Sequence, residues 1–167
     1  MKLTLKRAAS LHLFAAAFLS APILASCDNN EVIPDAKVVF MTGRNGTVIT
    51  EDTIAVKIGS TAKTYFEVTY HFNDENLNHP YKVLRQYDNN VPEDLSPVFD
   101  GEERIPVFEH DDFSQGETTI SSEGYGTGKC TVRTAFSKKF VHVGSVVKIS
   151  VNVGNDAYGE LCYKVEE

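Results

Sequence analysis

The sequence has no excess of basic residues. Its 167 residues include 16 Lys and Arg against 23 Asp and Glu, for a formal net charge of -7. Three of the basic residues, Lys2, Lys6 and Arg7, stand in the first seven positions, so the rest of the chain is more acidic still. Because a nucleic-acid-binding surface needs clustered Lys and Arg to neutralise phosphates, this balance argues against a nucleic-acid partner.

Helical periodicity and long apolar runs are also missing. Beyond the N-terminal leader, no window repeats its apolar residues at roughly 3.6 positions, so no amphipathic helix is expected. The chain is nevertheless 42% apolar, with 10 Phe and 7 Tyr, which is enough to build a core. Its length has room for one domain.

The first 27 residues have the layout of a secretory signal. Residues 1–10 are short and positive, residues 11–19 are rich in Ala, Leu and Phe, and Leu24-Ala25-Ser26-Cys27 follows. The apolar stretch is too short for a membrane span, which needs about 20 apolar residues. A plain signal peptide, cut after small residues, is one interpretation.

Leu24-Ala25-Ser26-Cys27 also resembles the lipobox of bacterial lipoproteins, in which Leu and two small residues precede an obligatory Cys. The resemblance implies that residues 1–26 are a cleaved signal peptide and that the Cys27 thiol receives a diacylglycerol. A thiolate is a suitable nucleophile near neutral pH. Two or three acyl chains, such as palmitate, give the stable membrane anchoring that one chain does not.

A polar tether at residues 27–35 follows the anchor, and Pro34 discourages regular structure within it. The acidic residues just after Cys27 resemble the surface-export signal of Bacteroidetes lipoproteins. In enterobacteria, Asp at this position resembles an inner-membrane retention signal instead. The start of the chain is more similar to the Bacteroidetes type, which implies the outer membrane or the cell surface.

Apolar and polar residues alternate repeatedly through residues 36–167 and predict many short strands. In residues 62–72, Phe66 and Val68 share one face and Tyr65 lies on the other. Asn45-Gly46 is typical of a type I′ hairpin turn, whose residues have positive φ. Strands are expected at 36–41, 47–50, 53–58, 62–72, 81–87, 105–109, 118–122, 129–136, 140–143, 146–153 and 159–165.

Many short strands separated by turn signals indicate a sandwich or a barrel. We expect an all-β, immunoglobulin-like β-sandwich as a single domain over residues 36–167. Val56–Ser60 and Val141–Ser145 each lead through a Gly-Ser corner into a long alternating strand, a pattern that resembles the start of many bacterial Ig-like modules.

Cys130 and Cys162 are the cysteines left after Cys27. Export favours a disulfide between them. Strand alternation, however, puts Cys130 on a core face with Val132 and Cys162 on a surface face with Lys164. Two separate thiols, one buried and one exposed, are therefore the alternative.

No metal or cofactor site is predicted. The histidines at 71, 79, 110 and 142 lack the close spacing of a zinc site. The acidic residues between Asp100 and Asp112 lack the spacing of a calcium loop, so a solvated loop is expected and weak calcium binding is a minor alternative.

Catalytic motifs are missing as well. Gly124–Cys130 is similar to a phosphate loop, but Glu123 stands at the position of its first glycine and a strand follows instead of a helix. A flexible Gly-rich turn is expected there. No G-x-S-x-G elbow occurs, although a triad is defined in space and not along the chain.

Asp52-Thr53-Ile54 resembles the acceptor motif of O-glycosylation in Bacteroidetes, which would place a glycan on Thr53. The alternative is that these residues simply form the polar start of a strand.

Two classes of function remain. The first is a non-catalytic, lipid-anchored module that binds an envelope protein complex or an extracellular glycan. The second is a small envelope enzyme or carbohydrate-handling accessory, with the acidic segment between Asp100 and Asp112 as its site. Tyrosines clustered on one exposed face would favour glycan binding, and dispersed ones a structural partner; the candidates are Tyr65, Tyr70, Tyr81, Tyr87 and Tyr125.

Overall fold

The computed structural model of the protein describes residues 33–73, 76–100, 103–122 and 124–167. The described residues belong to one compact unit and contain strands and loops but no helix. The predicted signal peptide (1–26), Cys27 and most of the predicted tether (27–35) lie outside the described residues.

The all-β prediction is confirmed. The strands are β1 (Lys37–Met41), β2 (Thr53–Lys57), β3 (Thr61–His71), β4 (Lys82–Tyr87), β5 (Glu93–Asp94), β6 (Val98–Phe99), β7 (Pro106–Val107), β8 (Phe113–Ile120), β9 (Tyr125–Ala135), β10 (Val146–Val153) and β11 (Ala157–Glu166).

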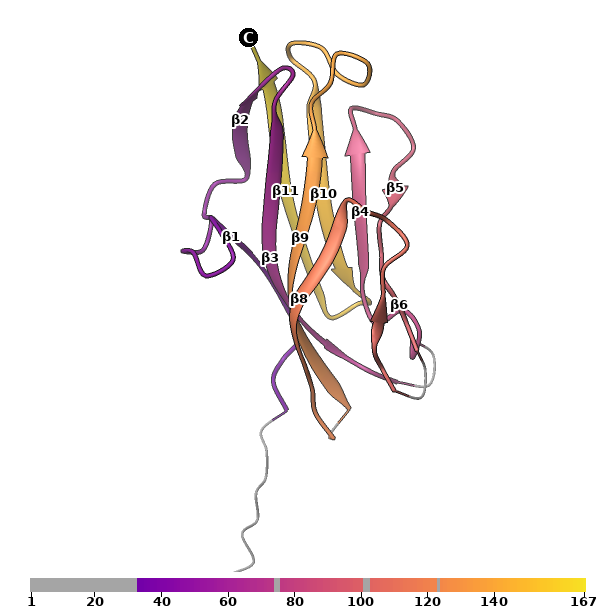
Figure 1. Ribbon diagram of the computed structural model, residues 1–167. Helices are drawn as coiled ribbons and strands as arrows, with labels where there is room; N and C mark the ends of the chain where they lie inside the picture. The colour runs from indigo at the N-terminus through magenta and orange to yellow at the C-terminus, as the bar shows by residue number, and fades with distance from the viewer. Residues whose placement is uncertain (1–32, 74–75, 101–102, 123) are drawn as a thin grey trace, which may run out of the picture. The chain divides into compact units, whose positions relative to one another are not determined.

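The strands form two layers. A four-stranded antiparallel sheet has the order β1-β3-β9-β8, and a five-stranded sheet has the order β2-β11-β10-β4-β5. In the five-stranded sheet β2 runs parallel to β11, whereas the other neighbours are antiparallel. β6 and β7 pair with each other. Figure 1 shows one sheet in front of the other, an arrangement consistent with a β-sandwich.

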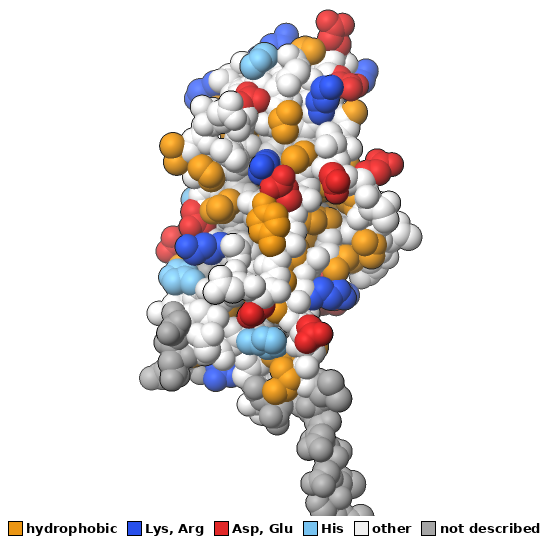
Figure 2. All heavy atoms as spheres, turned by 180° about the vertical axis from the view of Figure 1, so that it is seen from behind, with side chains coloured by type: hydrophobic (Ala, Val, Ile, Leu, Met, Phe, Trp, Pro, Cys, Tyr) orange, Lys and Arg blue, Asp and Glu red, His pale blue; other side chains and the backbone are white. Residues whose placement is uncertain are grey.

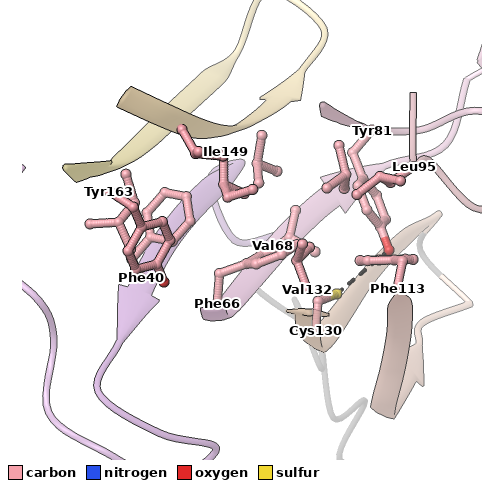
Figure 3. Close-up of a cluster of buried hydrophobic side chains, with 14 of the residues drawn as sticks. Phe40, Phe66, Val68, Tyr81, Leu95, Phe113, Cys130, Val132, Ile149 and Tyr163 are labelled. Carbon is pink, nitrogen blue, oxygen red and sulfur yellow. Dashed lines mark hydrogen bonds between the residues drawn. The ribbon is translucent and has the colours of Figure 1, made fainter. Parts of the chain in front are cut away.

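The core lies between the two sheets and is made of the residues that the alternation predicts. Phe66 and Val68 of β3 are fully buried, as is Ile149 of β10. Figure 3 shows Ile149 on one side of this core and Val68 and Phe66 on the other. The ring centroids of Phe40 and Phe66 lie 5.8 Å apart. Each large apolar side chain buried in this way contributes roughly 1.5–3 kcal/mol, which makes the core the main source of stability.

The chain reverses at Asn45-Gly46, where Thr42 N donates to Thr47 O at 3.0 Å, but it does not use the expected type I′ turn. Neither residue has the positive φ of a type I′ turn, and 47–50 is not a strand. A single bridge joins Met41 to Val48. The predicted reversal is present, but the strand at 47–50 is not, because the chain crosses here from the four-stranded sheet, which holds β1, to the five-stranded sheet, which holds β2.

The strand expected at 140–143 is also absent and is replaced by turns. Phe140 N donates to Ser137 O at 2.8 Å, and Ser145 N donates to His142 O at 3.0 Å. These local hydrogen bonds satisfy the backbone without a neighbouring strand. The short strands β5 and β6 precede the acidic segment between Asp100 and Asp112, and β7 lies within that segment and inside the predicted strand at 105–109.

β9 begins earlier than predicted because two glycines form part of the strand and not of a flexible turn. A Cβ on Gly126 would lie 2.6 Å from Cε2 of Tyr70. A Cβ on Gly128 would lie 2.6 Å from Cδ of Gln115. The glycines therefore leave room for two side chains that pack directly against the backbone of β9.

Candidate functional site

A groove of about 510 Å³ opens where β2 and the start of β3 diverge, and we call it the edge groove. Its volume is in the range of ligand-binding sites. Partly buried side chains that also pack against the core, such as Ile54, Val56 and Ala62, line it. Solvent therefore reaches the apolar interior at this place. The other apolar lining residues are Met41, Val48, Ile49 and Tyr163.

One wall of the edge groove is a free strand edge. Among the described residues, no strand pairs with Thr61–Thr64 of β3 on the side of β1. Phe40 O accepts a hydrogen bond from the loop that follows β1, so the backbone N–H and C=O of Phe40 point away from β3. The backbone N–H and C=O groups of successive strand residues point to alternate sides, so those of Met41 and of its partner Tyr65 point toward each other. Two residues before Tyr65, Lys63 therefore directs its N–H and C=O out of the free edge.

The facing wall has a free edge as well, because β2 is the outermost strand of its sheet. Ile58 N donates to Glu166 O at 3.0 Å on the side of β11. By the same alternation, Ala55 directs its backbone groups away from β11, whereas the carbonyl oxygen of Lys57 already accepts a hydrogen bond from Ser60 N at 3.1 Å. Two free edges thus bound one groove.

The floor of the edge groove is held in place by a buried hydrogen bond between the sheets. The hydroxyls of Thr64 on β3 and Tyr163 on β11 lie 2.8 Å apart. Burial raises the pKa of Tyr163, so its hydroxyl keeps its proton. A fixed floor means that the groove is preformed.

Thr53, the residue of the resemblance to a glycosylation motif, is exposed at the start of β2. Its side chain points away from the core, opposite to that of Ile54. The acceptor hydroxyl is therefore accessible, and its glycosylation stays a prediction.

The histidines that were considered as zinc ligands do not form a metal-binding cluster in the described ranges. His71 Nε2 lies 2.8 Å from Pro34 O, where it holds the N-terminal end of the described chain against β3. No group of three His, Cys, Asp or Glu in the described ranges could hold a metal ion.

One Asp, Ser and His do meet, next to β10. Ser145 Oγ donates to Asp88 Oδ2 at 2.9 Å and lies 3.0 Å from His142 Nδ1. In a hydrolytic triad the histidine stands between serine and carboxylate and removes the serine proton. Here that proton goes directly to Asp88, and Ser145 is buried at 1% exposure. Asp88 also accepts from Val146 N at 2.8 Å, so the cluster fixes a turn.

The acidic segment between Asp100 and Asp112 contributes to a buried ion pair. The Arg85 side chain, 6% exposed, donates to Asp112 Oδ2 at 3.0 Å and to Glu93 Oε2 at 2.7 Å. Burial alone would lower the pKa of Arg85, but the hydrogen bonds with these carboxylates outweigh it and the net pKa is raised. Asp112 is thus engaged in holding the fold, whereas carboxylates for glycoside hydrolysis must be free and paired.

The two described cysteines are free and occupy opposite sheets. Cys130 of β9 is buried, with Sγ 3.7 Å from the Tyr81 hydroxyl, the dashed contact in Figure 3. Burial raises the pKa of its thiol to about 12. Cys162 of β11 is partly exposed, with Sγ 3.6 Å from Glu160 Oε1. This arrangement matches the expectation of separate thiols and not the disulfide.

The candidate tyrosines do not gather on one face. Tyr70 and Tyr81 are core residues at 0% and 1% exposure, contrary to their proposed role as exposed platforms. Tyr65 and Tyr125 lie on the outer face of the four-stranded sheet, six register positions apart along β3, or about 20 Å. Tyr87 packs against Phe140, with ring centroids 5.8 Å apart.

No model of a known protein family matches the chain, and no similar curated protein is found. Within the described part of the chain, no helix has the length and hydropathy needed to cross a membrane.

Sequence reasoning missed the edge groove. It found the strands on both sides, since 53–58 and 62–72 were predicted. It could not find that they diverge into different sheets, because that depends on the parallel pairing of β2 with β11. The abrupt end of the apolar pattern after Met41 was the one local signal.

Proposed function

We propose that the protein is a lipid-anchored, non-catalytic binding or assembly module of a bacterial envelope. The lipobox-like Leu24–Cys27 and the acidic residues after it support an anchor at the outer membrane or the cell surface. The polar tether at 27–35 would hold the β domain off the bilayer.

For the domain we propose an immunoglobulin-like sandwich. The order β1-β3-β9-β8 corresponds to A-B-E-D of that fold, and β11-β10-β4 corresponds to G-F-C. In this assignment the first strand is split, with β1 in one sheet and β2 in the other. The split would be the origin of the edge groove.

The function proposed for the edge groove is docking of an extended segment from a partner protein. The observation that carries it is that two free strand edges face one apolar groove. A segment in the β conformation would supply the missing backbone hydrogen bonds and place alternate apolar side chains on Ile54, Val56 and Ala62, as in other cases of strand addition.

Proline at position 63 tests this proposal. The Lys63 N–H points out of the free edge, where proline is tolerated because no ladder hydrogen bond is lost. Lys63→Pro therefore removes a docking donor while keeping the domain folded. Lys63→Ala is the matched control, because it loses the same side chain but retains the N–H.

Both variants, as full-length tagged chains, are cross-linked in the cells that make the protein and then purified. A partner recovered with Lys63→Ala and lost with Lys63→Pro supports strand docking, provided that circular dichroism shows both variants to be folded. Equal recovery with both variants would show that the partner does not use the free edge.

A further inference from the structure

A second groove, of about 480 Å³, lies on the outer face of the four-stranded sheet, and we call it the polar groove. Tyr65 of β3 and Thr131 of β9, which are register partners, line it. Lys63 and Arg133 form the adjacent register pair and line it too. Arg44, from the loop after β1, completes a set of three cations.

Arg44 crosses the sheet to reach β8. A Cβ on Gly116 would lie 3.2 Å from Nη2 of Arg44. The neighbouring Asn45 accepts a hydrogen bond from Lys129 Nζ at 3.4 Å, which holds this loop against the sheet. The guanidinium of Arg44 therefore lies beside Gly116 and borders the groove.

The charges of the polar groove are unbalanced. Like charges directly opposite on neighbouring strands are destabilising, and Lys63 stands opposite Arg133. Among the described residues, neither of them nor Arg44 forms an ion pair, although Arg44 interacts electrostatically with Glu117, which is itself paired with Lys129. Two carboxylates border the groove, but that of Asp112 is held by Arg85 at 3.0 Å. Asp111, which is exposed, is the other.

The excess of positive charge in the polar groove differs from the charge of the rest of the protein. The net charge of the chain is -7, so a groove with three unpaired cations is contrary to its composition. Figure 2 shows the side opposite to the view of Figure 1, where acidic, basic and apolar side chains are interspersed without a field of one sign. An anionic ligand would relieve the repulsion between Lys63 and Arg133.

We propose that the polar groove binds an acidic saccharide. Arg133 and Lys63 would take a carboxylate or sulfate group, since a guanidinium matches both oxyanions with paired donors. The Tyr65 ring would lie against a sugar ring, and the Thr131 hydroxyl would bond to a sugar hydroxyl. The groove volume suits one or two sugar units. The two grooves share Lys63, whose backbone borders the edge groove and which also lines the polar groove, but the proposal does not depend on strand docking.

The test is calorimetric titration of the full-length chain in detergent with four probes: tetragalacturonate, a chondroitin sulfate tetrasaccharide, neutral xylotetraose and inorganic phosphate. We expect at least one acidic saccharide to bind, with affinity that falls as NaCl is raised, because salt screens exposed charges. Binding of tetragalacturonate shows that carboxylates suffice, whereas binding of the chondroitin sulfate alone, which carries carboxylates and sulfates, indicates that the sulfate is needed. Binding of xylotetraose or phosphate as tight as that of both acidic sugars, or no binding at all, would overturn the proposal.

Variants locate the site. Arg133→Gln should weaken the saccharide about tenfold, and Tyr65→Ala should weaken the saccharide without changing phosphate binding. Lys164→Gln, at an exposed position of β11, removes the same charge from the other sheet and should change nothing. Equal losses for Arg133→Gln and Lys164→Gln would assign the effect to net charge. If Arg133→Gln were unfolded, Lys63→Gln, which keeps the backbone of the free edge, takes its place.

Discussion

Arg85 and Arg133 stand in facing sheets and are joined by a hydrogen bond, from Arg85 Nη1 to the Arg133 carbonyl oxygen, 2.7 Å long. The same guanidinium binds Glu93 and Asp112, so one buried cation links β4, β5, β9 and the start of β8. The two carboxylates are 43% and 40% exposed, whereas the arginine is nearly buried.

This difference in exposure predicts which partner matters more. Removing both acids with Glu93→Gln and Asp112→Asn leaves a buried cation without an anion and should lower the free energy of unfolding by about 3–5 kcal/mol. Arg85→Met should lower the free energy of unfolding by less, about 1–3 kcal/mol, because the exposed carboxylates can be rehydrated by solvent. Urea unfolding measures both. Lys148→Ala, which breaks the surface pair with Glu160, should cost only about 0–1 kcal/mol. A larger loss for Arg85→Met than for the double variant would contradict the account.

The glycines of β9 give a second prediction. Gly126→Ala should lower the free energy of unfolding by about 1–3 kcal/mol, because the new methyl group would collide with the buried Tyr70 ring. Gly43→Ala is the control, since nothing lies within 4 Å of its Cβ position. Thermal unfolding of the two variants should separate them clearly. Equal stability of the two variants would mean that the Tyr70 ring can move aside without lowering the free energy of unfolding.

The thiols give a third prediction. Air-exposed folded protein, alkylated without reductant, should show Cys162 labelled well before Cys130, because Cys162 is partly exposed, even though partial burial and Glu160 raise the pKa of its thiol as well. Cys130 should be labelled only on unfolding, since its thiol is buried and its pKa is raised to about 12. Peptide mass spectrometry assigns the two labels. Recovery of a peptide with Cys130 bonded to Cys162 would show that the sheets rearrange to form the disulfide.

Alkaline pH should destabilise the protein. Burial raises the pKa of Cys130 from 9.0 to about 12, so above pH 9 the unfolded chain loses a proton that the folded chain retains. The contribution is complete below pH 9 and is lost as pH rises towards 12, by at most about 1.4 kcal/mol per pH unit. Tyr70, whose pKa burial raises from 10.0 to about 12, adds a second loss above pH 10.

Between pH 9 and 10 the effect of Cys130 can be isolated by urea unfolding. Cys130→Ala should flatten the decline in this interval, and Cys162→Ser, which removes the partly exposed thiol, should flatten it less. An unchanged slope in Cys130→Ala would show that another group titrates.

The anchor gives the fifth prediction. Cys27→Ser should abolish incorporation of a labelled fatty acid and release the protein from membranes, because a hydroxyl without activation is a poor nucleophile. Metabolic labelling and membrane fractionation test it. Label retained by the variant would contradict the lipobox interpretation.

The sequence predicted the structure best in strands whose residues alternate between buried and exposed. The alternation from 62 to 72 predicted β3 and the face of each of its side chains, because one side of that strand is core. The prediction from sequence failed where contacts between residues distant in the sequence determine the local structure. Gly126 and Gly128 indicated a turn, but Tyr70 and Gln115 explain them as strand residues.

The candidate sites were harder to predict than the strands. Lys63 and Arg133 are 70 positions apart, and only the register of β3 with β9 places them opposite each other. Tyr65 was a candidate platform from the sequence, and alternation places it on the face opposite to Tyr70, which is buried in the core, but nothing local showed which cations lie beside it. Alternation assigns a face to each residue, whereas pairing between distant strands determines its neighbours.

The free edges that bound the edge groove also expose the protein to polymerisation with itself, because an unpaired strand edge can template another copy. Lys57 and Lys63, both exposed, stand on these edges. Positive charge on an edge strand disfavours edge-to-edge pairing of two copies, so we expect these lysines to oppose fibre growth. Acetylation of these two side chains would remove that barrier while leaving the backbone edges unchanged.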